Sequence, residues 1–144
     1  MRNQIKITLL LLLMVTLISA CAKKTTPTPT TDTGIANPAS VNCLDKGGKL
    51  DIQERADLGQ IGICVFDNNP QCDEWALFRG ECPVGGVDIS GYASQAAVFC
   101  AISGGEYAVT GNNGAADEQG TCTFKNNKSC DAWDYYNGKC SPNE

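Results

Sequence analysis

Eight of the nine cysteines fall into two sets of four with nearly the same spacing. Neighbouring cysteines are 21, 8 and 10 residues apart in the first set and 22, 8 and 10 apart in the second. A Gly-Gly pair, an Asn-Asn pair and a tryptophan recur at matching offsets, so one supersecondary unit is repeated at about 58 residues. We predict two tandem domains, residues 36–84 and 87–144, with a hinge in the segment 83–91. The two sets are Cys43, Cys64, Cys72 and Cys82, and Cys100, Cys122, Cys130 and Cys140.

The N-terminal segment, residues 1–20, is typical of a bacterial lipoprotein signal peptide. Two basic residues precede an apolar run of about twelve residues, which is shorter than the roughly 20 needed to cross a bilayer. The run ends in Ile-Ser-Ala-Cys, which fits the motif that leaves a lipid-modified cysteine, here Cys21, at the new N-terminus. A diacylglyceryl thioether with acyl chains such as palmitate would hold the protein on a membrane. The alternative is a short anchor that is not cleaved.

The segment that follows is expected to be a linker. Residues 21–35 are rich in Thr and Pro and have too few large apolar side chains to bury a core. Ala22 follows the lipidated cysteine, whereas an Asp there would favour the inner membrane in enteric-type bacteria. We therefore predict export and a lipid anchor in the outer membrane, facing the periplasm or the cell surface.

The remaining cysteines are predicted to form four disulfides, two in each copy. A unit of fewer than about fifty residues buries too little surface to be stable alone, and exported proteins make up the difference with disulfides. The rival interpretation is zinc. Structural zinc sites use close Cys-x-x-Cys pairs, whereas these cysteines are at least 8 residues apart and the chain has no histidine. We expect no metal and no other cofactor.

Each copy is predicted to be a small disulfide-rich α+β unit in the order helix, strand, strand, short helix. In the first copy Asn37 caps the opening helix, with Pro38 at its first position and Gly47 beyond its end. The opening helix of the second copy is expected to run from about Tyr92 to Ser103. The predicted strands are residues 49–53 and 61–66 in the first copy, and 106–110 and 120–124 in the second.

The closing phrases, CDEWALFRGEC (72–82) and CDAWDYYNGKC (130–140), are predicted to be disulfide-closed clasps. A straight helix would separate the two ends by about 15 Å, whereas the Cα atoms of a disulfide lie within about 7 Å of each other. Gly80 and Gly138 are expected to reverse the chain. The predicted pairs are then Cys72–Cys82 and Cys130–Cys140, which leaves Cys43–Cys64 and Cys100–Cys122 to pin the first helix to the second strand.

The aromatic residues of the clasps are predicted to fill the core. In each clasp the opening cysteine, the tryptophan and a second aromatic residue stand three apart, which places them along one side of a helix. We expect that side to face the sheet. The predicted core residues are Trp75, Phe78, Trp133 and Tyr136.

The two copies together resemble a small bacterial domain of unknown function that occurs in secreted proteins and lipoproteins and is often labelled a haemolysin. In the first copy the resemblance rests on Asn37-Pro38-Ala39, Cys43, Gly47-Gly48, Gly62, Cys64, Cys72 and Asp73-Glu74-Trp75-Ala76. The second copy keeps the cysteines, the glycines and Trp133, but has Ser94-Gln95-Ala96 and Ala132 at the other places. The resemblance implies no catalytic residues and no established activity. Nothing in the mature chain resembles a pore-forming helix or hairpin, so we expect no lysis.

Most catalytic chemistry is excluded by what the chain lacks. Without histidine, Ser-His-Asp and Cys-His catalysis are unavailable, and bridged cysteines leave no thiolate nucleophile. Asp73 and Glu74 are candidates for acid–base work, but the second copy has Ala132 in place of Glu74, and solvation at a helix start is the better account. A loop beginning at Asp67 lacks the Gly and Glu that an EF-hand requires. We predict that the protein is not an enzyme and has no catalytic or metal-binding residues.

The mature chain is strongly acidic. Removal of residues 1–20 takes away two basic residues and no acidic ones, which leaves sixteen acidic and nine basic residues and a net charge of −7. Such a surface repels nucleic acid and anionic lipid, and it would suit a basic partner, although solubility explains it equally well. The expected partners are the membrane, through the lipid on Cys21, and an envelope protein of unknown identity.

Two functions fit these features. The favoured one is a non-enzymatic envelope lipoprotein that displays two disulfide-stabilised modules for binding or for a structural role. The alternative is a protease inhibitor whose loop 53–60 offers Arg55 to a trypsin-like pocket. The matching loop of the second copy has no basic residue, so at most one copy would inhibit. An inhibition assay against serine proteases distinguishes the two functions.

Overall fold

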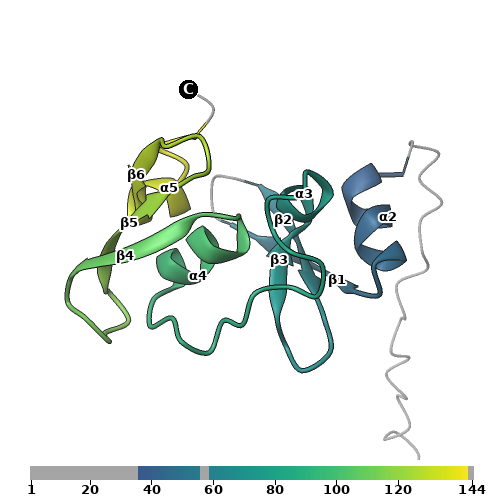
Figure 1. The fold of residues 1–144 in the computed structure, drawn as a ribbon, viewed down its shortest axis with the longest axis horizontal. Helices are drawn as coiled ribbons and strands as arrows, with labels where there is room; N and C mark the ends of the chain where they lie inside the picture. The colour runs from purple at the N-terminus through teal and green to yellow at the C-terminus, as the bar shows by residue number, and fades with distance from the viewer. Residues whose placement is uncertain (1–35, 56–58, 143–144) are drawn as a thin grey trace, which may run out of the picture. The chain divides into compact units, whose positions relative to one another are not determined.

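Each copy folds into a three-stranded antiparallel sheet with two helices (Figure 1). The structure is a computed structural model that describes residues 36–55 and 59–142. The predicted signal peptide, Cys21 and the linker lie outside the described residues. The first copy contains α2 (Pro38–Asp45), β1 (Lys49–Glu54), β2 (Gln60–Val65), β3 (Gln71–Asp73) and α3 (Glu74–Phe78). The second contains α4 (Gln95–Ile102), β4 (Glu106–Gly111), β5 (Gln119–Thr123), β6 (Ser129–Asp131) and α5 (Ala132–Tyr136).

The opening helices begin at side-chain caps. The Asn37 side-chain oxygen accepts a hydrogen bond from the N–H of Ala39 at 3.0 Å, as predicted. In the second copy the Ser94 hydroxyl accepts from the N–H of Ala97 at 3.1 Å, so α4 begins after this cap and not near Tyr92. Among the helices of the described ranges, none has the length and hydropathy needed to cross a membrane.

The strand orders are β1-β2-β3 and β4-β5-β6. The two predicted strands of each copy are present, but the third strand, only three residues long, was not predicted. This strand contains the cysteine that opens the clasp. Cys72 lies opposite Cys64 in the β2–β3 register, and Cys130 lies opposite Cys122 in the β5–β6 register. Each clasp therefore starts in the sheet and not in the helix.

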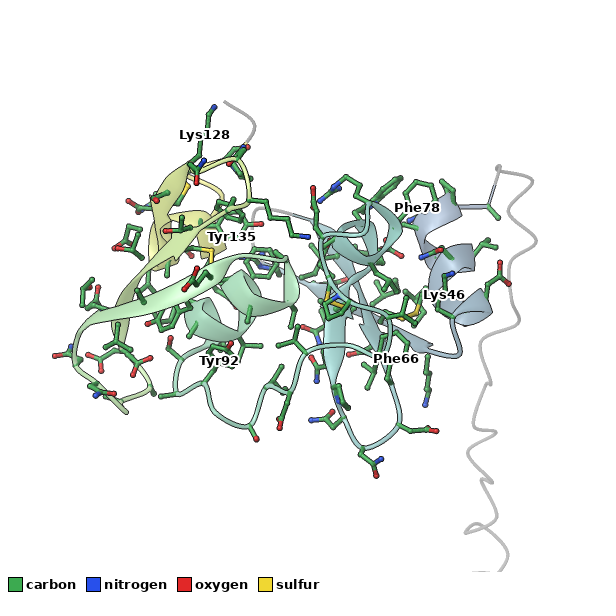
Figure 2. The ribbon with its side chains drawn as sticks, viewed as in Figure 1. Lys46, Phe66, Phe78, Tyr92, Lys128 and Tyr135 are labelled. Atoms are coloured by element: carbon green, nitrogen blue, oxygen red, sulfur yellow. A yellow bond between two sulfur atoms is a disulfide. The ribbon has the colours of Figure 1, made fainter. Side chains whose placement is uncertain are left out.

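The four predicted disulfides are present, and Figure 2 shows them among the side chains. They are Cys43–Cys64, Cys72–Cys82, Cys100–Cys122 and Cys130–Cys140, with Cα separations between 5.6 and 6.0 Å. Gly80 and Gly138 have φ values of 75° and 70° and reverse the chain after α3 and α5, as predicted. In the first copy the bridged cysteines form one buried cluster with Ala76 and Leu77. The core of this copy is therefore made largely of disulfides.

Trp75 and Phe78 do not fill the core, contrary to the prediction. The two residues are 41% and 48% exposed, and their rings meet edge to face at 5.7 Å between centroids. The prediction counted helical spacing from Cys72, but that residue belongs to β3, and α3 begins only at Glu74. The residue of α3 that points into the core is therefore Ala76, which is fully buried.

The equivalent residues of the second copy are only partly buried. The indole N–H of Trp133 donates a hydrogen bond to the carbonyl of Glu118 at 3.0 Å, which ties α5 to the loop before β5. Tyr136 lies where the second copy meets the first. Trp133 and Tyr136 therefore make their contacts at the edge of the core and do not fill it.

The two copies pack against each other within one compact unit, Ile35–Glu144. The Lys125 ammonium of the second copy donates to the carbonyl of Gly80 in the first at 3.2 Å. The connecting segment predicted as a hinge is held to the first copy, because Val87 and Gln71 exchange two backbone hydrogen bonds of 2.9 Å. Independent folding of the two copies stays a prediction.

Candidate functional site

The residues that carry the family resemblance in the first copy meet around a buried carboxylate. Glu74 is only 4% exposed. Its Oε1 accepts a hydrogen bond from the Asn37 amide at 2.9 Å, and its Oε2 accepts one from the Ser40 hydroxyl at 2.6 Å. Gly62 of β2 makes room for this carboxylate, since a Cβ there would lie 2.6 Å from either oxygen. The prediction that Glu74 is solvated is therefore wrong, because Glu74 is buried and takes its hydrogen bonds from α2 and the cap residue of that helix.

The second copy fills the same space with a different side chain. Ala132 stands at the position of Glu74 and is fully buried. The ring of Tyr107 lies against Gly120, the counterpart of Gly62. Burial raises the pKa of the Tyr107 phenol. Because a tyrosine from another strand replaces the carboxylate, this space serves packing in both copies.

Asp73 has a different structural role from Glu74. Its carboxylate caps α3 by accepting a hydrogen bond from the N–H of Ala76 at 2.8 Å. Burial raises the pKa of Asp73, and the hydrogen bond from Ala76 opposes that rise. Asp131 caps α5 in the same way, through the N–H of Asp134 at 3.0 Å. Asp73 and Glu74 therefore have different partners and do not act together as an acid–base pair.

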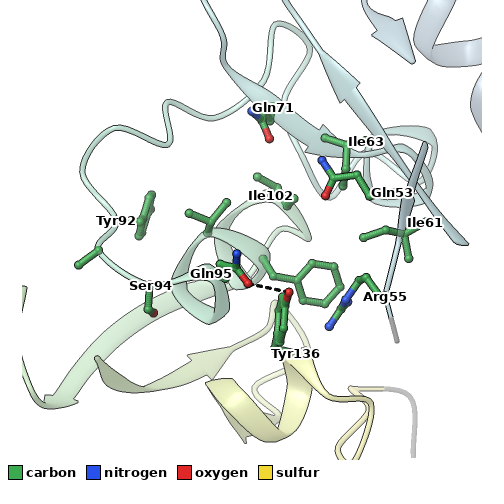
Figure 3. Close-up of a pocket in the computed structure, with 13 residues that line it drawn as sticks. Gln53, Arg55, Ile61, Ile63, Gln71, Tyr92, Ser94, Gln95, Ile102 and Tyr136 are labelled. Atoms are coloured by element: carbon green, nitrogen blue, oxygen red, sulfur yellow. Dashed lines mark hydrogen bonds between the residues drawn. The ribbon is translucent and has the colours of Figure 1, made fainter. Parts of the chain in front are cut away.

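An open cleft of about 320 Å³ lies between the two copies (Figure 3). One wall comes from the sheet of the first copy, and the other from α4, the segment before it and α5. The lining combines aliphatic and aromatic side chains with amides, and none of the described residues in it is acidic. The lining residues are Gln53, Arg55, Ile61, Ile63, Gln71, Tyr92, Ala93, Ser94, Gln95, Val98, Phe99, Ile102 and Tyr136.

The Arg55 guanidinium, the one cation of this lining, lies in a corner between two aromatic rings of the second copy. Its Cζ is 4.0 Å from the ring centroid of Phe99 and 4.0 Å from that of Tyr136, and these rings stand at 83° to each other. The Tyr136 hydroxyl donates to Gln95 Oε1 at 3.0 Å (Figure 3). Burial lowers the pKa of Arg55, but an arginine remains charged at neutral pH. Its Nη2 is buried and has no hydrogen-bond partner among the described residues.

The cleft uses part of the segment that the sequence analysis assigned to an inhibitory loop. Gln53 and Arg55 line it, whereas residues 56–58 lie outside the described residues. Sequence reasoning missed the partners of Arg55, because they depend on how the second copy docks on the first. The available signal was Phe99, the one aromatic residue in α4.

Two segments of the chain, residues 34–81 and 91–139, match a protein family described as "Domain of unknown function (DUF333)". The two matches coincide with the two structural copies and together cover more than half of the chain. The chain belongs to this family. The resemblance found in the sequence is thereby confirmed, as two tandem copies of one domain.

The curated relatives have names without a function. "Uncharacterized protein YoaF" of Escherichia coli K12 is 44% identical over 52 residues, which are 36% of this chain and 61% of the relative. Proteins of the same name from Escherichia coli O6:H1 and Shigella flexneri match to the same extent. The chain thus spans about three-fifths of the length of the curated relatives it matches. No solved structure matches the chain. Haemolysis is mentioned neither in the family description nor in the relatives' names.

Proposed function

We propose that the protein is a non-enzymatic lipoprotein of the bacterial envelope whose two copies together form one small binding site. The observation that carries the proposal is the cleft between them. Its lining comes from both copies, and its cation has no acidic partner among the described residues. Modules that served only as separate structural units would not need a shared cleft of this kind. The four disulfides agree with an oxidising environment outside the cytoplasm.

The described side chains support binding more than catalysis. All eight cysteines of the two copies are bridged, so none of them supplies a thiolate. The carboxylate of Glu74 is enclosed by its two donors, and that of Asp73 caps a helix. The cleft itself offers hydrogen-bonding groups and apolar surface, which suffice for recognition.

A protease-inhibitor function has less support. To inhibit a trypsin-like enzyme, Arg55 would have to extend from its loop into the enzyme's pocket. In the structure its guanidinium packs instead against Phe99 and Tyr136 of the second copy. Insertion into a protease would break both contacts, so we keep binding as the proposed function.

A pull-down tests the binding function. A soluble form that begins after Cys21 is immobilised and incubated with an envelope extract. The matched control is the same chain with its disulfides reduced and alkylated, which has the same sequence without the fold. Material retained by the native form alone supports the binding function. Equal retention by both forms, or no retention by either, contradicts it.

Membrane attachment is expected to depend on Cys21. Cys21→Ala removes the sulfur that forms the thioether, so the protein should move from the membrane fraction to the soluble fraction. Each buried methylene contributes about 0.8 kcal/mol, so the loss of two or three acyl chains should make this shift nearly complete. Ala22→Ser is the matched control and should stay with membranes. If the Cys21→Ala protein still resists detergent-free extraction from membranes, the prediction of a lipid anchor on Cys21 is wrong.

A further inference from the structure

The Arg55 guanidinium lines the cleft and has one donor, Nη2, that the described residues do not use. Phe99 and Tyr136 both contact the group, and because their rings stand at 83° to each other, the planar guanidinium can stack on only one of them. Nη2 is buried without an acceptor among the residues of the described ranges. A buried donor without a partner is costly, so a shift of the guanidinium that brings Nη2 to an acceptor on a ligand in the cleft would be favoured.

The neighbouring amides complement this donor. The side-chain nitrogen of Gln53 donates to Asp51 at 2.9 Å, and that of Gln71 donates to Asn69 at 3.2 Å. These bonds leave the two amide oxygens as acceptors. Figure 3 shows Gln53, Gln71 and Arg55 around the same opening. The cleft therefore combines a cationic donor with neutral acceptors.

The remaining lining is apolar and the space is small. Ile61 and Val98 are among the aliphatic side chains of the cleft. The volume of about 320 Å³ is at the lower end of the roughly 300–1,000 Å³ typical of ligand pockets. An occupant would have an anionic end, hydrogen-bond donors beside it and a small apolar group. The end of a peptide chain has these three features together.

We propose that the cleft binds the C-terminal end of a short peptide. The terminal carboxylate accepts hydrogen bonds from Arg55, the peptide N–H groups donate to the oxygens of Gln53 and Gln71, and a small apolar side chain lies against Ile61 and Val98. Arginine suits this partner because its planar donors match the two oxygens of a carboxylate. The inference rests on the proposed binding function and names the class of ligand.

Charge selects the place where such a ligand would bind. Without residues 1–20 the chain has a net charge of −7, which repels a carboxylate from most of the surface. The described lining of the cleft carries one cation and no acid. Residues 87–144 contain no arginine, so the second copy has no equivalent of Arg55. The part of the chain that the structure describes therefore has one such site, built from both copies.

Titration of the full chain, purified from membranes in a non-ionic detergent, tests the proposal. The probes are acetyl-Ala-Ala with a free carboxylate and the same dipeptide as its carboxamide. The acid is expected to bind saturably and the amide at least about tenfold more weakly, because the amide lacks the charge that Arg55 pairs. Equal affinity for acid and amide, or no binding of either, overturns the proposal.

Variants locate the contact. Arg55→Gln is expected to weaken binding of the acid by about tenfold to a hundredfold and to change binding of the amide little. Arg55→Lys keeps the charge without the planar donors and should recover only part of the affinity. Arg79→Gln is the matched control, since Arg79 pairs with Glu81 outside the cleft, and should bind as the unchanged protein does. Thermal unfolding checks that each variant is folded, and an Arg79→Gln loss as large as that of Arg55→Gln overturns the proposal.

The source of the peptide is tested by comparing the affinities of the D- and L-dipeptides. Tighter binding of acetyl-D-Ala-D-Ala than of the L-dipeptide indicates the end of a cell-wall peptide, and the reverse indicates the end of a protein; either result supports the carboxylate site. The pull-down separates this inference from the proposed function. If native protein and Arg55→Gln retain the same envelope material and neither dipeptide binds, the peptide inference falls and the binding function stands.

Discussion

Replacing Gly48 by alanine is expected to destabilise the first copy by about 3 kcal/mol or more. A Cβ at Gly48 would lie 3.0 Å from Cys43 Sγ, closer still to Cys64 Sγ, and 3.2 Å from the Cys43 carbonyl oxygen. Overpacking a core usually costs about 1–3 kcal/mol. Here the obstacle is a buried disulfide that joins α2 to β2, and it cannot move aside as the end of a flexible side chain does. The expected loss is comparable with the roughly 3 kcal/mol that such a bridge contributes. Thermal unfolding under oxidising conditions measures it.

Two further glycines serve as comparisons. Gly91→Ala is the matched control, because a Cβ there meets open space and its φ is not positive, so the unfolding temperature should hardly change. Gly105→Ala should repeat the effect in the second copy, where the Cβ would lie 2.8 Å from Cys100 Sγ. A Gly48→Ala protein as stable as Gly91→Ala would show that the first disulfide does not hold α2 this close to the sheet.

The features that the sequence predicts correctly depend on covalent reach and on neighbouring residues. The pairing of Cys72 with Cys82 follows from a chain that has to reverse within ten residues, and Gly80 supplies the reversal. The cap at Asn37 is recognisable because a proline follows it directly. Neither conclusion requires knowledge of which distant segments meet.

The features that the sequence does not predict depend on contacts between distant segments. The exposure of Trp75 depends on where α3 begins, and β3 decides this by pairing with β2. Acidic residues are rarely buried, so Glu74 is expected at the surface. Its donors come from α2 and its cap, 34 and 37 residues earlier in the chain. The cleft is a still longer-range feature, since Arg55 finds its aromatic partners in the other copy.

Loss of the buried carboxylate is expected to destabilise the first copy by about 3 kcal/mol. Glu74→Ala removes the acceptor of Asn37 and Ser40 and opens the space above Gly62. A hydrogen bond to a charged group is worth about 1.5–3 kcal/mol, and Asn37, which is exposed, is at the lower end of this range. The vacated space adds a cavity cost, because the backbone around Gly62 has no side chain to fill it. Denaturant unfolding of the variant measures the change.

The second copy shows how this loss can be offset, because it has an alanine at the position of Glu74 and fills the space with Tyr107. Leu50 is the counterpart of Tyr107, since each lies opposite the second cysteine of its copy in the strand register. Leu50→Tyr alone should also be destabilising, because the new ring and Glu74 would compete for one space. The double variant Leu50→Tyr/Glu74→Ala should be more stable than either single variant, with a coupling of about 1–3 kcal/mol. If the losses of unfolding free energy in the two single variants simply add, the new tyrosine does not enter the space above Gly62. A tyrosine at position 50 then cannot replace the buried carboxylate of the first copy as Tyr107 does in the second.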